Sequence, residues 1–319
     1  MEFDMLQHPL LLFLTIGSGI IITMIIFCFQ RKETQTKSDN NSLYYDKFSK
    51  CTSPGCVRCN NYELLKTDLS ERLLAYEKEI SKDGGCKGME LKRVQTSIEN
   101  SAEVDQEPSG LNSLQKPNVF TLEGLDAIPW CDDKFLSEIS VLEGAVQIVI
   151  QEYEEMLNEQ NIAEDFQGWV ENDVPDGMWS VFHLFNQGRK IEENCARCPK
   201  TVAILEEMES FMSGCVFGNA TFSVLEAGTH ITEHYGPCNL RIRCHLGLHI
   251  PRDCCTLTVA HQRRHWREGK CLLFDDSFLH EARHAGSQAQ GPRVVLLLDF
   301  WHPDITSAER DALRHLFHL

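Results

Sequence analysis

The chain has 319 residues and a formal net charge of −17, so its length allows one large domain or two small ones. Its acidic balance argues against nucleic-acid binding, which favours basic surfaces. The count of 14 cysteines is high for a cytosolic enzyme and points to disulfides, a structural metal or both.

An apolar run from Leu10 to Phe29 follows a short N-terminal tail, residues 1–9. The run has no charged residue and no polar face, and it is long enough to cross a bilayer as a helix. A cleaved signal peptide would have a positive leader, whereas this leader carries Glu2 and Asp4. The sequence therefore predicts a single-pass membrane protein with a transmembrane helix over residues 10–30.

The side of the membrane stays open. Arg31, Lys32 and Lys37 follow the run and no basic residue precedes it, which would keep the C-terminal bulk in the cytosol. The cysteine content argues for an oxidising lumen instead. Asn40 begins a glycosylation sequon that only a lumenal chain would use, whereas the sequon at Asn219 opens a core strand and is not expected to be glycosylated.

Residues 31–116 are predicted to form a stalk and linker, with a cysteine-rich segment over residues 51–59. Leucines at helical spacing predict a short helix over residues 62–82. Residues 83–116 are rich in Gly, Ser, Glu and Lys, which is typical of a linker.

The C-terminal part, residues 117–319, is predicted to be a mainly β domain with flanking helices. Helical periodicity predicts helices over 135–157 and 200–213, and Thr306 with Glu309 forms a capping box that begins a last helix. Short strands at this spacing favour a sandwich or barrel. The predicted strands are Met178–Phe185, Ala220–Glu226, Leu240–Leu248, Thr256–Ala260, Lys270–Phe274 and Arg293–Phe300.

Alternation along residues 240–248 separates a basic face from an apolar one. Arg241, Arg243 and His245 share the basic face, which lines either solvent or a polar pocket. Arg293 begins an almost wholly apolar strand, and a buried guanidinium needs an anionic partner. That partner is either an internal carboxylate, Asp275 or Asp276, or the carboxylate of a ligand.

His234 is predicted to lie in a loop between two strands, and His280 just past the strand at 270–274. Two imidazoles brought together across a sheet can bind a redox metal such as iron. Because the chain has 13 histidines, an ordinary structural role for either one is a strong alternative.

Four segments together resemble the catalytic domain of the aspartyl/asparaginyl β-hydroxylases, and in particular a membrane-anchored branch of that family with early cysteines. They are GTHITEHYGPCN at 228–239, RIRCHLGL at 241–248, EGKCLLFDDSFLH at 268–280 and DFWHP at 299–303. The resemblance runs from about Asp176 to Pro303. It implies a double-stranded β-helix, the jelly-roll barrel also found in cupins.

The resemblance also implies the site. His234 and His280 match the iron-binding histidines, and Gly236 stands where many related oxygenases have a carboxylate ligand. No further catalytic side chain is implied beyond these ligands. The positions matching those that hold 2-oxoglutarate are Trp179, Ser223, Arg243, His245 and Arg293.

The function implied by the resemblance is that of an Fe(II)- and 2-oxoglutarate-dependent dioxygenase. It would hydroxylate a protein side chain, at the β-carbon of Asp or Asn, with release of succinate. By the same resemblance the catalytic domain would be lumenal, in the endoplasmic reticulum or secretory pathway. The alternatives are a membrane-tethered binding module that keeps the pocket without turnover, and a metal-binding cupin with other chemistry.

Two Cys-x2-Cys pairs add a further hypothesis. Cys56 and Cys59 form one pair, and Cys195 and Cys198 form the other. Such a set is typical of a structural zinc site, while disulfides or reduced thiols are the alternatives.

Overall fold

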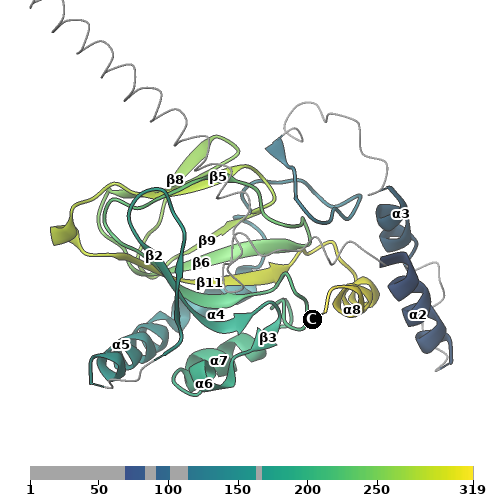
Figure 1. The fold of residues 1–319 in the computed structure, drawn as a ribbon, viewed down its shortest axis with the longest axis horizontal. Coiled ribbons are helices and arrows are strands. Elements are labelled where there is room, and N and C mark those ends of the chain that lie inside the picture. Colours follow the sequence, from purple (N-terminus) through teal and green to yellow (C-terminus); the bar gives the residue numbers. More distant parts are fainter. Residues whose placement is uncertain (1–68, 83–90, 101–113, 163–166, 319) are drawn as a thin grey trace, which may run out of the picture. The chain divides into compact units, whose positions relative to one another are not determined.

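The computed structural model describes residues 69–82, 91–100, 114–162 and 167–318. Antiparallel strands form two sheets, with helices at their flanks (Figure 1). The large sheet has the order β1-β2-β4-β11-β6-β9, with β3 paired to β2, and the small sheet has the order β5-β10-β7-β8. The strands are β1 (Trp169–Asn172), β2 (Trp179–Asn186), β3 (Arg189–Lys190), β4 (Ala220–Leu225), β5 (His230–His234), β6 (Arg241–His249), β7 (Cys255–Val259), β8 (Gln262–His265), β9 (Cys271–Phe274), β10 (His280–His284) and β11 (Arg293–Trp301).

From β4 onward the chain passes repeatedly between the two sheets. As a result strands far apart in sequence pair with each other, β4 with β11 and β5 with β10. This is the strand order of a jelly roll. The prediction of a mainly β fold with flanking helices is confirmed.

The side chains of β11 alternate between two cores. Val294, Leu296 and Leu298 pack in the core between the large sheet and its helices. Val295 and Leu297 belong to the second core, which contains residues of both sheets and lies inside the barrel. Because successive side chains of a strand point to opposite faces, one apolar strand serves both cores.

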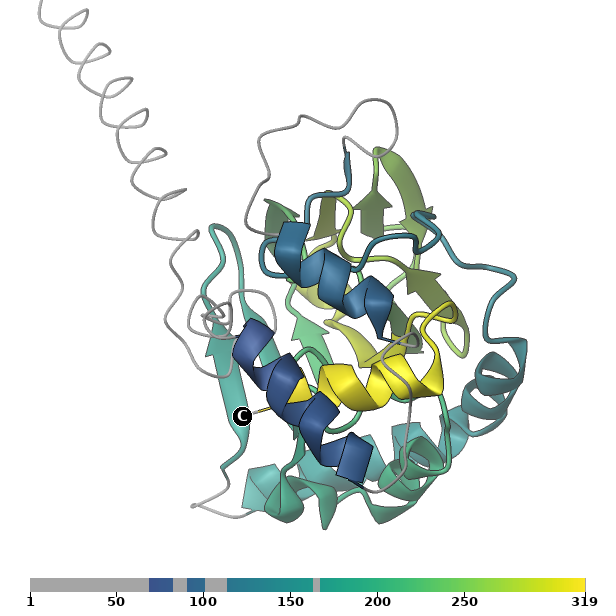
Figure 2. The same ribbon diagram turned by 90° about the vertical axis from the view of Figure 1, so that its right-hand side faces the viewer.

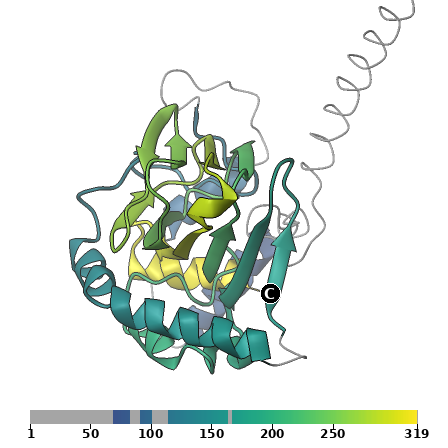
Figure 3. The same ribbon diagram turned by 90° about the vertical axis from the view of Figure 1, so that its left-hand side faces the viewer.

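The helices on the outer face of the large sheet differ from the predicted ones. Residues 135–157 form two helices because the backbone at Ala145 leaves helical geometry (φ −95°, ψ 2°). The helix expected at 200–213 ends at Glu206. Figure 3 brings α5 to the front. The bounds are α4 (Leu136–Gly144), α5 (Val146–Ile162), α6 (Glu192–Cys195) and α7 (Pro199–Glu206).

Three helices form a separate layer, seen at the front in Figure 2: α2 (Leu69–Lys82), α3 (Lys92–Asn100) and α8 (Ser307–Leu316). The capping box at the start of α8 is confirmed. The expectation of a linker over 83–116 is wrong for α3, which buries Val94 and Ile98. Arg93 also donates to Glu309 at 2.6 Å, so this segment packs as part of the domain.

His234 and His280 lie on two strands that the sequence did not predict. His234 is the last residue of β5 and His280 the first residue of β10. Alternation missed β5, β8 and β10 because each has a polar or charged residue at most positions.

The expected localisation as a single-pass membrane protein of the secretory pathway needs correction. In the part of the chain that the structure describes, no helix combines the length and the apolar character needed to span a membrane. The longest of these, α5, has 17 residues and several Glu and Gln side chains. The predicted span at 10–30, the cysteine-rich segment and the sequon at Asn40 lie outside the described residues.

Candidate functional site

The centre of the candidate site is the pair His234 and His280. Their backbones are direct partners across β5 and β10, and their ring centroids lie 4.1 Å apart. Each Nδ1 lies 2.8 Å from the carbonyl oxygen two residues earlier, that of Thr232 or Phe278. Because a carbonyl can only accept, each Nδ1 carries the proton and each Nε2 carries the lone pair. This is the arrangement of metal-binding histidines whose second nitrogen is anchored to the backbone.

Burial keeps His280 neutral. Its pKa is lowered to about 4 by burial, with the Asp276 carboxylate opposing the shift. A neutral imidazole is the form that binds a metal.

Gly236 leaves no room for a third ligand from its own position. A Cβ atom at Gly236 would lie 2.7 Å from Cγ and Oδ1 of Asp276. Asp276 cannot yield easily, because it is ion-paired with Arg241 and Arg243. A carboxylate residue at 236 would therefore disrupt the barrel interior, and the described residues offer two histidines without one.

Arg293 is buried without an acidic partner. It is 2% exposed, and no carboxylate among the described residues lies within ion-pairing distance. Its Nη1 donates weakly to the Ser223 carbonyl at 3.5 Å, its Nε has no partner, and its guanidinium lies 4.8 Å over the ring of Trp266. Burial lowers the pKa of Arg293 to about 10, so the side chain remains cationic at neutral pH.

The internal partners considered for Arg293 are engaged elsewhere. Asp276 binds two other arginines, and Asp275 accepts hydrogen bonds from Ser277 and Gln115. An unpaired buried cation is costly unless an anion binds to it. The surroundings of Arg293 are therefore suited to an anionic group.

His245 provides a second donor without a partner. The indole N–H of Trp266 donates to its Nδ1 at 3.1 Å, so the proton of the neutral ring is on Nε2. That buried Nε2 has no hydrogen-bond partner. Burial, then the neighbouring charge of Arg293, holds the pKa of His245 well below its usual value. Trp266 thus connects two N–H groups that lack an acceptor, the Nε2–H of His245 and the Nε–H of Arg293.

Trp179 and Ser223 complete this wall of the barrel. The indole N–H of Trp179 donates to Oγ of Ser223 at 3.0 Å, and both residues are buried. Trp179 and Arg293 are both backbone partners of Leu225. Four of the five residues predicted to hold 2-oxoglutarate are therefore brought together on β2, β4, β6 and β11.

Arg243, the fifth, has a different environment. It donates to Asp299 through Nε at 2.8 Å and Nη2 at 3.0 Å, and its Nη1 lies 3.1 Å from Asp276. Arg241 binds the same two carboxylates, with Nη2 2.5 Å from Asp276. The basic face read from the sequence is thus neutralised inside the protein, and Arg241 and Arg243 do not provide free positive charge for a ligand.

The paired cysteines are only partly described. Cys195 and Cys198 are buried free thiols that form no disulfide, and burial raises their pKa to about 11 and about 12 respectively. The Cys195 thiol donates to the Leu184 carbonyl at 3.2 Å. Cys56 and Cys59 lie outside the described residues, so the four-cysteine hypothesis stays a prediction. The sequon residue Asn219 is fully buried and bonded to Asp299.

Sequence reasoning missed one cluster of potential ligands, formed by Cys254, Cys255 and His284. The adjacent cysteines are a visible signal, but their histidine partner follows only from the pairing of β7 with β10.

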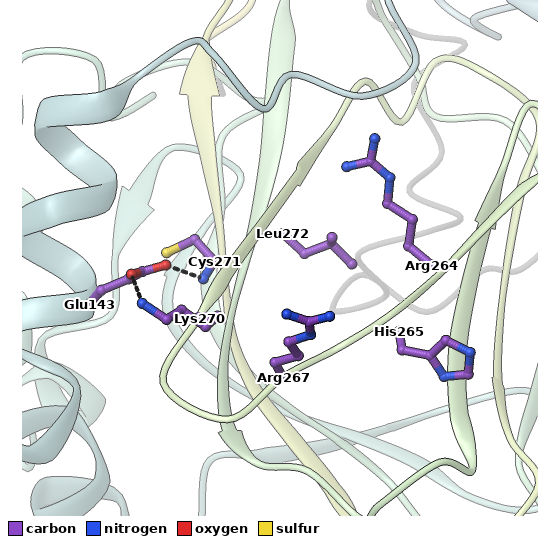
Figure 4. Close-up of a pocket in the computed structure, with 7 residues that line it drawn as sticks. All are labelled: Glu143, Arg264, His265, Arg267, Lys270, Cys271 and Leu272. Atoms are coloured by element: carbon purple, nitrogen blue, oxygen red, sulfur yellow. Dashed lines mark hydrogen bonds and ion pairs between the residues drawn. The ribbon is translucent and has the colours of Figure 1, made fainter.

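A cavity of about 500 Å³ opens elsewhere, beside β8 and β9 (Figure 4). Glu143 there binds Lys270 at 2.6 Å and the backbone N–H of Cys271 at 3.0 Å. The predicted site residues do not line it. Its walls are Glu143, Arg264, His265, Arg267, Lys270, Cys271 and Leu272.

Comparison with known proteins gives consistent results. The family model described as Aspartyl/Asparaginyl beta-hydroxylase matches residues 143–303. The human aspartate beta-hydroxylase domain-containing protein 2 is 43% identical over 269 residues, which cover 84% of this chain and 70% of that protein. The mouse aspartyl/asparaginyl beta-hydroxylase is 36% identical over 207 residues, or 63% of this chain and 27% of that protein.

Similarity to solved structures is weaker. A Pseudomonas putida prolyl-4-hydroxylase aligns with a TM-score of 0.32 and 11% identity, covering 52% of this chain and 98% of that chain.

Proposed function

Since the chain belongs to the aspartyl/asparaginyl β-hydroxylase family, we propose that it is an Fe(II)- and 2-oxoglutarate-dependent dioxygenase that hydroxylates a protein side chain. The observation that supports this most is Arg293, a buried cation without a carboxylate partner in the described residues, in the same barrel as a histidine pair. A dicarboxylate would supply the missing anion.

The residues present fit the metal. His234 and His280 would hold iron(II) through the Nε2 atoms, because each Nδ1 proton is fixed on a backbone carbonyl. When bound, iron(II) with 2-oxoglutarate and dioxygen would supply the oxidising chemistry that protein side chains lack.

The residues also fit the cosubstrate. Arg293 would bind one carboxylate of 2-oxoglutarate through its unsatisfied Nε, and the Nε2–H of His245 would donate to the same ligand. Trp266 would keep the two donors in place, since it stacks under Arg293 and donates to His245. The apolar barrel core, which includes Leu257 and Phe274, would exclude water from this pocket.

The proposed substrate class follows from the family name. An Asp or Asn side chain of a protein would be hydroxylated at its β-carbon. Incubation of the enzyme with candidate protein domains should give a product heavier by one oxygen atom. Turnover of 2-oxoglutarate without any such product would support dioxygenase activity but show that these Asp or Asn side chains are not its substrates.

The experiment for the metal compares two histidine variants. His234→Ala should lose tightly bound iron and the conversion of 2-oxoglutarate to succinate, while the barrel still folds. His265→Ala is the matched control, because His265 is exposed on β8 and should keep both properties. Equal iron content in the two variants would contradict the assignment. Iron and 2-oxoglutarate binding without succinate formation would favour a binding module instead.

A further inference from the structure

Cys254, Cys255 and His284 form a second cluster of potential metal ligands, at one end of the small sheet. Each offers one ligand atom, and these atoms all lie within 4.8 Å of one another. Cys255 begins β7 and is the direct backbone partner of His284, the last residue of β10. The cluster shares no residue with the pair His234 and His280.

The hydrogen bonds of His284 prepare one of its nitrogens as a ligand. Its Nε2 lies 2.9 Å from the carbonyl oxygen of Gly291, which can only accept, so Nε2 carries the proton. Its Nδ1 accepts from the backbone N–H of Gly286 at 3.1 Å and therefore has the lone pair. A histidine whose one ring N–H donates to a backbone carbonyl is typical of metal sites, and a metal at Nδ1 would take the place of the Gly286 N–H.

The two sulfur atoms have the spacing of a tetrahedral zinc site. Sγ of Cys254 lies 3.8 Å from Sγ of Cys255. Two thiolates at about 2.3 Å from a tetrahedral zinc would be about 3.8 Å apart, so the cysteines need little movement to bind it.

The loop after β10 closes tightly over the cluster. A Cβ atom at Gly286 would lie 2.7 Å from Cε1 of His284 and 2.8 Å from Sγ of Cys254. The side-chain amide of Gln290 also reaches Sγ of Cys254 at 3.7 Å. Only glycine fits at 286, and the loop's polar groups face the cluster.

We propose that Cys254, Cys255 and His284 bind Zn²⁺, with a water molecule as the fourth ligand, in a site separate from the histidine pair. Two soft thiolates and one imidazole select zinc over iron(II) or magnesium. The ion would join the start of β7, the end of β10 and the following loop, and it would stabilise this end of the barrel.

The binding step is balanced without any redox change. Zn²⁺ replaces the protons of two thiols, so two Zn–S bonds form, two S–H bonds break, and two protons pass to solvent. His284 contributes its Nδ1 lone pair as a neutral ligand, and the Gly286 N–H must find another acceptor. Zinc affinity should therefore rise with pH.

The site lies near the proposed cosubstrate pocket. Burial and the neighbouring Cys254 raise the pKa of the Cys255 thiol to about 12, and the nearby Arg293 guanidinium opposes this shift. Binding of the ion itself requires no dicarboxylate.

The test uses the full chain in which His234 and His280 are both replaced by Ala, so that metal at the proposed iron site does not interfere. Titration with Co²⁺, a spectroscopic substitute for zinc, should give thiolate-to-cobalt charge-transfer absorption. Zn²⁺ should displace it. Cys254→Ser and Cys255→Ser should each remove this signal and one equivalent of bound zinc.

Cys195→Ser is the matched control, because it removes a buried cysteine of the predicted four-cysteine set and leaves the present cluster intact. Cys195→Ser should keep the equivalent of bound zinc that Cys254→Ser loses. Cys254 is only partly buried, so its variant should fold even if that of Cys255 does not. The same zinc content in Cys254→Ser and its parent would overturn the proposal, as would a Cys254–Cys255 disulfide found by mass spectrometry in the zinc-treated protein.

Discussion

Arg243 and Arg293 both point into the barrel interior, but their surroundings differ in charge. Arg243 lies with Arg241 between Asp276 and Asp299, so two cations face two anions. Arg293, on the adjacent strand, has a carbonyl and an indole ring beside it and no carboxylate within ion-pairing distance in the described structure. The comparison separates two roles of a buried arginine: the paired one maintains the fold, and the unpaired one is available to an anionic ligand.

The largest expected effect is on the paired group. Asp299→Ala leaves Arg243 without its main acceptors, and breaking a buried ion pair costs about 3–5 kcal/mol. Urea unfolding of the variant should show this loss. Asp132→Ala is the control, because Asp132 pairs with Arg264 at the surface and such pairs contribute at most about 1 kcal/mol. Equal losses of unfolding free energy in the two variants would mean that the buried ion pairs stabilise the protein no more than a surface pair does.

Acid should reduce the stability that the buried ion pairs of Asp276 contribute. Burial alone would raise the pKa of Asp276, but the neighbouring Arg241 and Arg243 guanidiniums hold it below its usual value. The pKa of Asp276 is therefore lower in the folded protein than in the unfolded chain. Between these two values the unfolded chain binds more protons, so the stability that Asp276 contributes above about pH 4 is lost as the pH falls. The unfolding free energy should fall more steeply in this range for the parent than for Asp276→Asn. Parallel profiles would contradict the assignment.

A smaller effect is expected on the affinity for 2-oxoglutarate when His245 is replaced. His245→Phe removes the unpaired Nε2–H and keeps a ring against Trp266. The affinity for 2-oxoglutarate should fall by about 1.5–3 kcal/mol, the usual contribution of a hydrogen bond to a charged group. Calorimetric titration in the absence of oxygen measures it. Unchanged affinity would show that His245 does not bind the cosubstrate, and it would not test Arg293.

The sequence predicted the apolar strands well and the polar ones poorly. β11 is apolar along nearly its whole length because it is buried on both faces, so its pattern was plain. β8, QRRH, is largely exposed at the edge of the small sheet, and its pattern carries little information. Residues 135–157 keep helical periodicity on both sides of Ala145, so the break between α4 and α5 was not visible.

Within the site, residue type and spacing identified the candidates but not their partners. The alternation of β6 correctly placed Arg243 and His245 on one face. Whether each arginine meets a carboxylate depends on register between strands: Asp299 is the direct partner of Arg243, whereas Arg293 is opposite Leu225. Such pairings arise from the three-dimensional fold, so the sequence did not show that Arg243 meets a carboxylate and Arg293 does not.

The role of Arg293 is tested by the affinity for 2-oxoglutarate of the parent and of Arg293→Met, measured by calorimetry with Mn²⁺ in place of iron and without oxygen. Arg267→Met, an exposed arginine at the cavity of Figure 4, is the control. Arg293→Met alone should lose about 2–5 kcal/mol of binding free energy, with stability unchanged or increased because an unpaired buried charge is removed. Equal affinity of Arg293→Met and the parent would show that this unpaired arginine does not bind the dicarboxylate.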